Sequence, residues 1–233
     1  MTSERFQLFD VTHIGALLVF VVGAVVLVLV GRRRRHIEGP DHVARGLAVA
    51  LALVALPWQA SELISAEGGL RNSLPLQLCN IAWIATVIAL WTKNQAMSVM
   101  VFLWGVTLST QALITPDLAT PFPHLRFVAF WVLHLLGVWG GIYLVVGLGI
   151  RPTWRHYRFT LLVTAAWMVT AFVVNVSAGT NYGYLNRKPP LGSVLDYFPP
   201  WPWYVLVEIV LVGTVWALIV AAFRPRHSSR RIA

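Results

Sequence analysis

The chain has 233 residues, of which 58% are hydrophobic and only 12% are charged, and its mean hydropathy is +0.70. Soluble domains carry about 25% charged residues, so this composition excludes an ordinary soluble protein and indicates an integral membrane protein. The net charge of +9 would suit nucleic acid, but most lysines and arginines lie in short segments beside apolar runs, where membrane topology explains them. We therefore expect membrane lipids as partners and no nucleic acid.

Seven apolar runs are long enough to cross a bilayer as helices. They cover about residues 13–31, 43–64, 74–91, 96–115, 124–149, 159–178 and 201–223. We expect the first run to be retained rather than cleaved as a secretion signal, because four arginines, Arg32 to Arg35, follow it where small residues would mark a cleavage site. The sequence predicts an all-α fold: a single seven-helix membrane domain over residues 1–233.

The connections are short except for residues 179–200, which contain four prolines and three glycines. Such a segment cannot form regular helix. Irregular backbone in hydrocarbon must be covered by protein or line a wet cavity. We therefore expect this loop to fold over a pocket as a lid, with Asn181 and Tyr182 turned towards polar residues of the helices at 74–91 and 124–149.

The distribution of lysine and arginine predicts the orientation. With the N-terminus outside, the inner segments carry thirteen of these residues and the outer segments five. The positive-inside rule then places the C-terminus inside, with residues 224–233 as a basic cytoplasmic tail. We expect a multi-pass protein of the cell membrane.

Under this topology, polar side chains that a membrane helix does not need gather in the outer half of the membrane. They are His13, Gln59, Glu62, Gln77, Cys79, Asn80, Gln111, His124, His134, Asn175, Asn181, Tyr182, Asp196 and Glu208. A transport pathway needs polar groups through the full thickness or at both faces. A one-sided distribution instead predicts a pocket that opens to the outer leaflet side.

Cys79 is the only cysteine, so it has no partner for an intrachain disulfide. One interpretation is a small apolar residue packed between helices; the other is a nucleophile, which needs a base to form the thiolate. His134 is the best candidate base, because a histidine at that depth needs a partner inside the bundle. Gly137 and Gly141 would let another helix approach it closely, and the alternative role for His134 is a packing hydrogen bond.

Other polar residues are candidates for supporting or substrate-binding roles. Gln77, Asn80 and Gln111 are neutral donors suited to steadying an oxyanion, Glu62 is placed to orient an imidazole, and His124 is a second candidate base. The outer histidines lack the three- or four-residue spacing that puts two metal ligands on one helix face. We expect no metal and no cofactor.

Several motifs together resemble a known family. LPLQLCN opens a helix, ITPDL and FPHLRF precede a helix with an inner histidine, and GTNYGYLNRKPP and FPPWPWY follow. In these motifs the chain, from about residue 10 to 223, resembles the YwaF-like integral membrane proteins, a bacterial family related to an animal transmembrane family that includes an ether-phospholipid acyltransferase. The resemblance implies a seven-helix fold and acyl transfer between lipids, with Cys79 matching the family cysteine and His134 its histidine. It also shows a departure, because Gln77 stands where many relatives have a histidine.

Two functions follow as hypotheses. The first is cysteine-dependent acyl transfer on phospholipids, with a phospholipid donor and a lysophospholipid acceptor. The alternative is a non-catalytic membrane protein, a sensor or partner subunit, that binds a lipid or small molecule in the same pocket.

Overall fold

The computed structural model describes residues 6–65, 74–190 and 193–223. Its α-helices are α1 (Val11–Arg34), α2 (His42–Ser65), α4 (Leu78–Thr92), α5 (Gln95–Trp104), α6 (Thr110–Ile114), α7 (Leu125–Ile142), α8 (Trp154–Ala178) and α9 (Trp203–Ala222). Two π-helical segments, η1 (Gly105–Ser109) and η2 (Tyr143–Gly147), join α5 to α6 and extend α7. The predicted tail at 224–233 lies outside the described residues.

Within the described residues, six helical rods are long and apolar enough to cross a membrane: α1, α2, α5 to α6, α7 with η2, α8 and α9. The prediction of an all-helical, multi-pass membrane protein is confirmed at this level. Helix α4 has 15 residues, which is about 22 Å at the α-helical rise and shorter than a hydrocarbon core of about 30 Å. It starts later than predicted, since the segment before it forms a turn in which Leu76 N–H donates to Leu74 O (2.8 Å).

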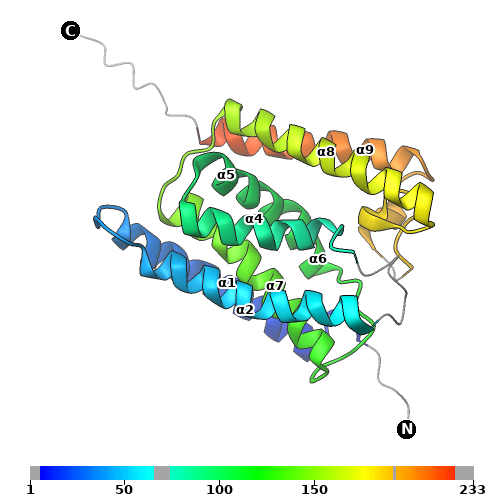
Figure 1. Cartoon of the computed structure of the whole chain (residues 1–233), viewed down its shortest axis with the longest axis horizontal. Helices are drawn as coiled ribbons and strands as arrows, with labels where there is room; N and C mark the ends of the chain where they lie inside the picture. The colour runs from blue at the N-terminus through cyan, green and yellow to red at the C-terminus, as the bar shows by residue number, and fades with distance from the viewer. Residues whose placement is uncertain (1–5, 66–73, 191–192, 224–233) are drawn as a thin grey trace.

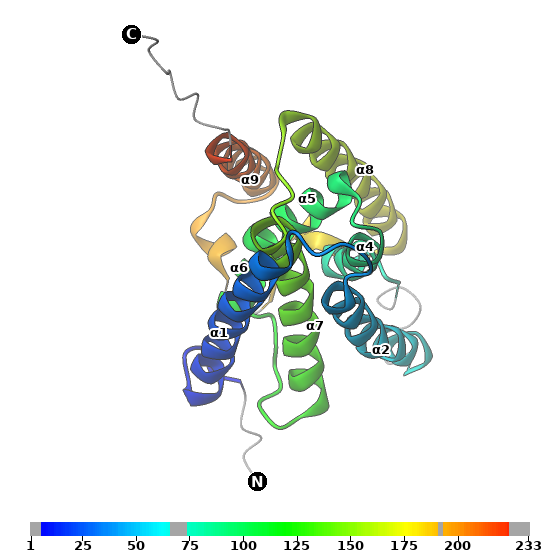
Figure 2. The same ribbon diagram turned by 90° about the vertical axis from the view of Figure 1, so that its left-hand side faces the viewer.

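The helices are arranged in three layers (Figure 1). Helices α1 and α2 form one outer layer, α8 and α9 form the other, and α4, α5 and α6 lie between them. Viewed from one end, α7 runs between α1 and α2 (Figure 2). The 179–200 connection forms two short 3₁₀ turns, η3 (Tyr182–Tyr184) and η4 (Val194–Tyr197), at the end of the molecule opposite the loop between α1 and α2.

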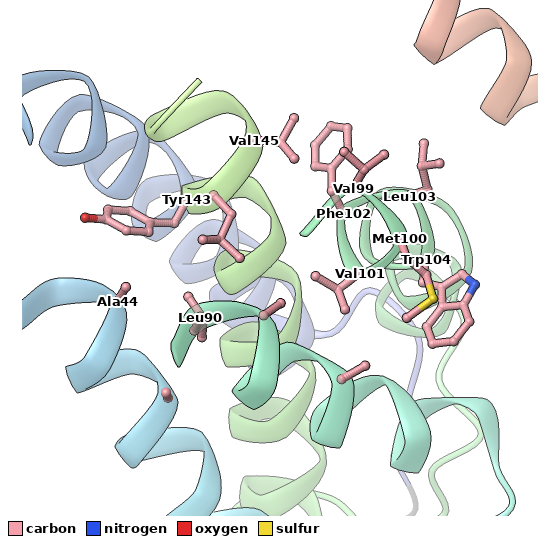
Figure 3. Close-up of a cluster of buried hydrophobic side chains, with 14 of the residues drawn as sticks. Ala44, Leu90, Val99, Met100, Val101, Phe102, Leu103, Trp104, Tyr143 and Val145 are labelled. Atoms are coloured by element: carbon pink, nitrogen blue, oxygen red, sulfur yellow. The ribbon is translucent and has the colours of Figure 1, made fainter. Parts of the chain in front are cut away.

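Helix α5 is the centre of the core. All seven residues from Ser98 to Trp104 are buried, and they pack against Leu90 of α4 and Tyr143 of η2 (Figure 3). Gly141 of α7 lets this packing be close, since a Cβ built there would lie 2.8 Å from the Phe102 Cα. Small residues at such contacts are how membrane helices gain van der Waals contact without a hydrophobic driving force between them.

At the end of the molecule where α1 meets α2, polar bonds fix the connection. Asp41 accepts from the backbone N–H groups of Val43 and Ala44 (both 3.1 Å) and from the Tyr143 hydroxyl (3.0 Å to each oxygen). Arg35 donates to the carbonyl of Gly147 (2.7 Å) and so satisfies one carbonyl at the end of η2. These bonds attach the connection between α1 and α2 to η2. The cavity lies towards the opposite end of the molecule.

Candidate functional site

A cavity of about 790 Å³ opens between the middle layer and the α8–α9 layer. This volume is in the range of sites that hold small organic ligands. Its walls come from the last turns of α2, the first turns of α4, the first half of α7, and from η1, α6, α8, α9 and the 179–200 loop. Because α2 ends where α4 and α7 begin, the polar part of this wall lies towards one end of the bundle.

Most of the candidate residues lie in this wall. The cavity is lined by Glu62, Gln77, Cys79, Asn80, Gln111 and His134. His124, Asn181 and Tyr182 are not part of the lining. The fold therefore brings the candidate nucleophile and one of the two candidate bases to a single cavity.

Cys79 is the second residue of α4, where backbone N–H groups favour negative charge. It is half-buried and packs against Trp83 and Leu133. Its thiol donates to Asn80 Oδ1 (3.3 Å), while Asn80 Nδ2 donates to Gln59 Oε1. Asn80 thus connects the thiol of Cys79 to α2.

His134 is 6% exposed, and its tautomer follows from its contacts. Its Nδ1 lies 2.8 Å from the carbonyl of Phe130, and a carbonyl only accepts, so Nδ1 carries the proton. In the neutral ring, Nε2 is then the basic nitrogen, and no described residue hydrogen-bonds to it. The imidazole is held in place by the Phe130 ring (centroids 4.2 Å apart) and the edge of Trp83 (6.3 Å).

The other two outer histidines have different surroundings. His124 is exposed and N-caps α7, accepting from the backbone N–H of Arg126 with Nδ1 (3.2 Å). His13 is fully buried: its Nδ1 accepts from Phe9 N–H and its Nε2 donates to Leu113 O, both at 2.9 Å. Both ring nitrogens of His13 are therefore occupied by structural bonds.

Some of the charged residues at the cavity form ion pairs. Glu62 accepts from the Arg126 guanidinium at 2.7 Å, and the guanidinium also lies over the Trp58 ring (5.9 Å). Glu62 is thus engaged by an arginine rather than by an imidazole. Glu208 adds a further carboxyl to the wall from the second turn of α9.

The 179–200 loop covers part of the cavity, through residues that differ from those expected. Gly183, Tyr184 and Leu185 line the wall, and Gly183 N–H donates to the side chain of Gln77 (3.0 Å). Tyr182 is buried, with its hydroxyl accepting from Leu74 N–H (3.1 Å) just before α4. Asn181 instead bonds within the loop, donating to Arg187 O (2.9 Å).

Tyr184 and Asp117 form a contact that sequence reasoning missed. The Tyr184 hydroxyl donates to Asp117 Oδ2 at 2.5 Å, and both residues line the cavity. Burial, then the adjacent Asp117 carboxylate, raises the pKa of Tyr184 well above its ordinary value, and burial also raises the pKa of Tyr182. Tyr184 therefore remains a proton donor at neutral pH. An aspartate in a proline-containing connection carries no sequence signal of this role.

Asn175, at the end of α8, organises the loop. Its Oδ1 accepts from Thr180 Oγ1 (2.8 Å) and Tyr182 N–H (2.7 Å), and its Nδ2 donates to Tyr182 O (3.0 Å) and Asn186 Oδ1 (2.9 Å). Asn175→Ala removes the side-chain bonds to the backbone N–H and carbonyl of Tyr182, and each hydrogen bond lost costs about 1 kcal/mol. We expect a lower melting temperature in detergent and faster proteolysis within the loop. Ser177→Ala, which removes an exposed bond in the same helical turn, is the matched control; equal melting of the two variants would contradict this role.

The chain was compared with protein families and with known proteins. The model of the TMEM164 family matches residues 8–220. The chain belongs to the TMEM164 family. The match runs from just before α1 to near the end of α9 and so includes every cavity-lining residue. No curated protein and no solved structure matches the chain.

Proposed function

We propose that this TMEM164-family protein transfers acyl chains between phospholipids inside the membrane, with Cys79 as nucleophile and His134 as base. The observation that carries the proposal is that both residues line one cavity while the Phe130 carbonyl holds the His134 proton on Nδ1. That arrangement leaves Nε2 as the proton acceptor that a cysteine nucleophile needs.

The proposed reaction has two steps, and each step balances in bonds and protons. In the first, His134 takes the thiol proton, the Cys79 sulfur attacks the ester carbonyl of a phospholipid, and the carbon–oxygen ester bond breaks. The lysophospholipid leaves with the proton from His134, and the acyl group remains as a thioester. In the second, the hydroxyl of an acceptor lysophospholipid gives its proton to His134 and attacks the thioester, which restores the ester and the thiol.

The surroundings support transfer over hydrolysis. The cavity lies among membrane-spanning helices, and apolar side chains such as Trp83, Leu133 and Phe130 surround the candidate pair. A hydroxyl-bearing lipid enters such a space more readily than water does, because water loses its hydrogen bonds there. Gln111 and Gln77 are in the wall as amide groups for a developing oxyanion. The resemblance to YwaF-like proteins, and through them to an ether-phospholipid acyltransferase, supports the same reaction class.

The test is an exchange assay in lipid nanodiscs. A phospholipid with a labelled acyl chain and an unlabelled lysophospholipid should yield a labelled phospholipid built on the acceptor. If the protein retains lipid, gains thermal stability from it and yet produces no exchanged product, the non-catalytic binding function would replace the proposal. Because Arg126 already pairs with Glu62, it is less available to bind the phosphate group of a lipid.

We also propose seven membrane crossings in the cell membrane, with the N-terminus and the 179–200 loop outside and the C-terminus inside, from the lysine and arginine distribution. Tyr197 is 91% exposed, and Glu38 is exposed in the loop between α1 and α2. In a Cys79→Ser background, Tyr197→Cys should react with a membrane-impermeant maleimide on intact cells, while Glu38→Cys should react only after lysis. The reverse pattern would overturn the orientation.

A further inference from the structure

The cavity continues past the polar residues into an apolar compartment between α8 and α9. Its walls are Leu161, Ala165 and Met168 of α8, Ile209 and Val212 of α9, and Leu108 of η1. The α8 and α9 residues recur at three- or four-residue spacing, so each set lies on one helix face. Membrane-spanning helices have apolar surfaces for lipid, but these residues also line the cavity.

Two buried tryptophans form part of the wall of this compartment. Trp104 and Trp216 are each 1% exposed and both line the cavity. The Trp104 Nε1–H donates to Thr164 Oγ1 (2.9 Å), and the Trp216 Nε1–H donates to Thr107 Oγ1 (3.0 Å). Because each indole N–H already has a partner, the surface that the rings offer to the cavity is apolar. The bonds join α5 to α8 and η1 to α9, so both rings are fixed by contacts between helices.

The cavity has both polar and apolar lining. Glu208 and Trp216 line it from the same helix, α9, about 12 Å apart along the helix axis. A ligand that fits this shape has a polar end at Cys79 and His134 and an unbranched apolar tail. A fatty acyl chain has that form, and removing its methylenes from water is favourable.

We propose that this compartment holds the acyl chain that is transferred and that Trp104 and Trp216 set the longest chain that fits. The identity of the ligand as a transferred group rests on the proposed function. The apolar lining of the compartment and the place of the two tryptophans in its wall do not.

A matched pair of variants tests the length limit. Val212 faces the compartment, whereas Val210, on the same helix, is 67% exposed on the outer surface. Val212→Phe should lower kcat/KM for stearoyl-phosphatidylcholine relative to octanoyl-phosphatidylcholine by at least about tenfold, since a site rejects chains that it cannot seat. Val210→Phe adds the same ring towards the bilayer and should keep the wild-type chain profile.

A second variant tests the same length limit in case Val212→Phe fails to fold. A Cβ built at Gly213 would meet only the Tyr157 hydroxyl, at 3.9 Å, so Gly213→Leu fits the helix and narrows the compartment at its α8 side. It should shift the profile in the same direction as Val212→Phe. A chain profile that neither variant shifts would overturn the inference and leave acyl transfer standing.

Direct binding separates this inference from the proposed function. In a Cys79→Ala background, a photoreactive stearic acid analogue should crosslink to peptides of α8 and α9, and Val212→Phe should reduce the yield while Val210→Phe does not. If wild-type protein shows no acyl exchange but this pattern holds, the compartment stands and the transfer function fails. If crosslinking avoids α8 and α9, the compartment is not an acyl site.

Discussion

Replacing Cys79 by alanine is expected to lower acyl exchange by at least about a thousandfold, as loss of the nucleophile does in enzymes that act through a covalent intermediate. The structure supports a selective effect, because the thiol is half-buried and donates a hydrogen bond to the adjacent Asn80. Removing one sulfur from this contact with Trp83 and Leu133 should cost only about 1 kcal/mol of stability.

Cys79→Ser is the companion variant. It keeps a hydrogen-bond donor for Asn80 and nearly the same volume, but a hydroxyl is a far weaker nucleophile than a thiolate at neutral pH. Exchange should therefore remain close to that of the alanine variant, while melting temperature and lipid retention stay near wild type. Exchange at the wild-type rate in the alanine variant would remove Cys79 from the mechanism.

The second large effect is expected at His134. His134→Gln removes the basic Nε2 and should lower kcat by about 10²–10⁴, the range that general acid–base catalysis contributes. Glutamine keeps an amide group near the Phe130 carbonyl that accepts from Nδ1, so the fold should survive. Exchange rates measured in nanodiscs at several pH values should also lose the limb that titration of the imidazole produces in the wild type.

His124→Gln is the control for His134. His124 is exposed and outside the cavity wall, so its replacement should leave exchange close to wild type even if the α7 cap is weakened. A loss in His124→Gln with full activity in His134→Gln would instead assign the base to His124. Both histidines were candidates from sequence. In the fold, His124 is the N-cap of α7 and His134 lies in the interior of that helix.

Much of the fold follows from sequence because lipid leaves few choices for the backbone. Most of the predicted apolar runs, such as those at 13–31 and 43–64, appear as helices close to their predicted bounds. The run at 74–91 illustrates the limit, because hydropathy does not distinguish a helix from the apolar turn that precedes it. Residues Leu74 to Leu76 stay outside α4, and Gln77 becomes its N-cap, which turns that side chain towards the loop.

The composition of the cavity was partly predictable. A polar residue in a membrane helix needs a reason, and Cys79, Asn80 and His134 were selected on that ground. Sequence did not distinguish the two loop residues: both Asn181 and Tyr182 were expected to face the helices, yet Tyr182 is buried against the start of α4 while Asn181 bonds within the loop. Asp117, Trp104 and Trp216 become functional candidates only when the fold brings distant segments to one cavity.

Trapping the acyl-enzyme tests the central proposal most directly. Wild-type protein incubated with acyl-labelled phospholipid and quenched in acid should carry the label on the peptide that contains Cys79, and neutral hydroxylamine should release it, as it cleaves a thioester. Adding lysophospholipid before the quench should move the label from the protein to new phospholipid. Formation of labelled product at the full rate with no hydroxylamine-sensitive label on Cys79 would contradict cysteine-dependent acyl transfer.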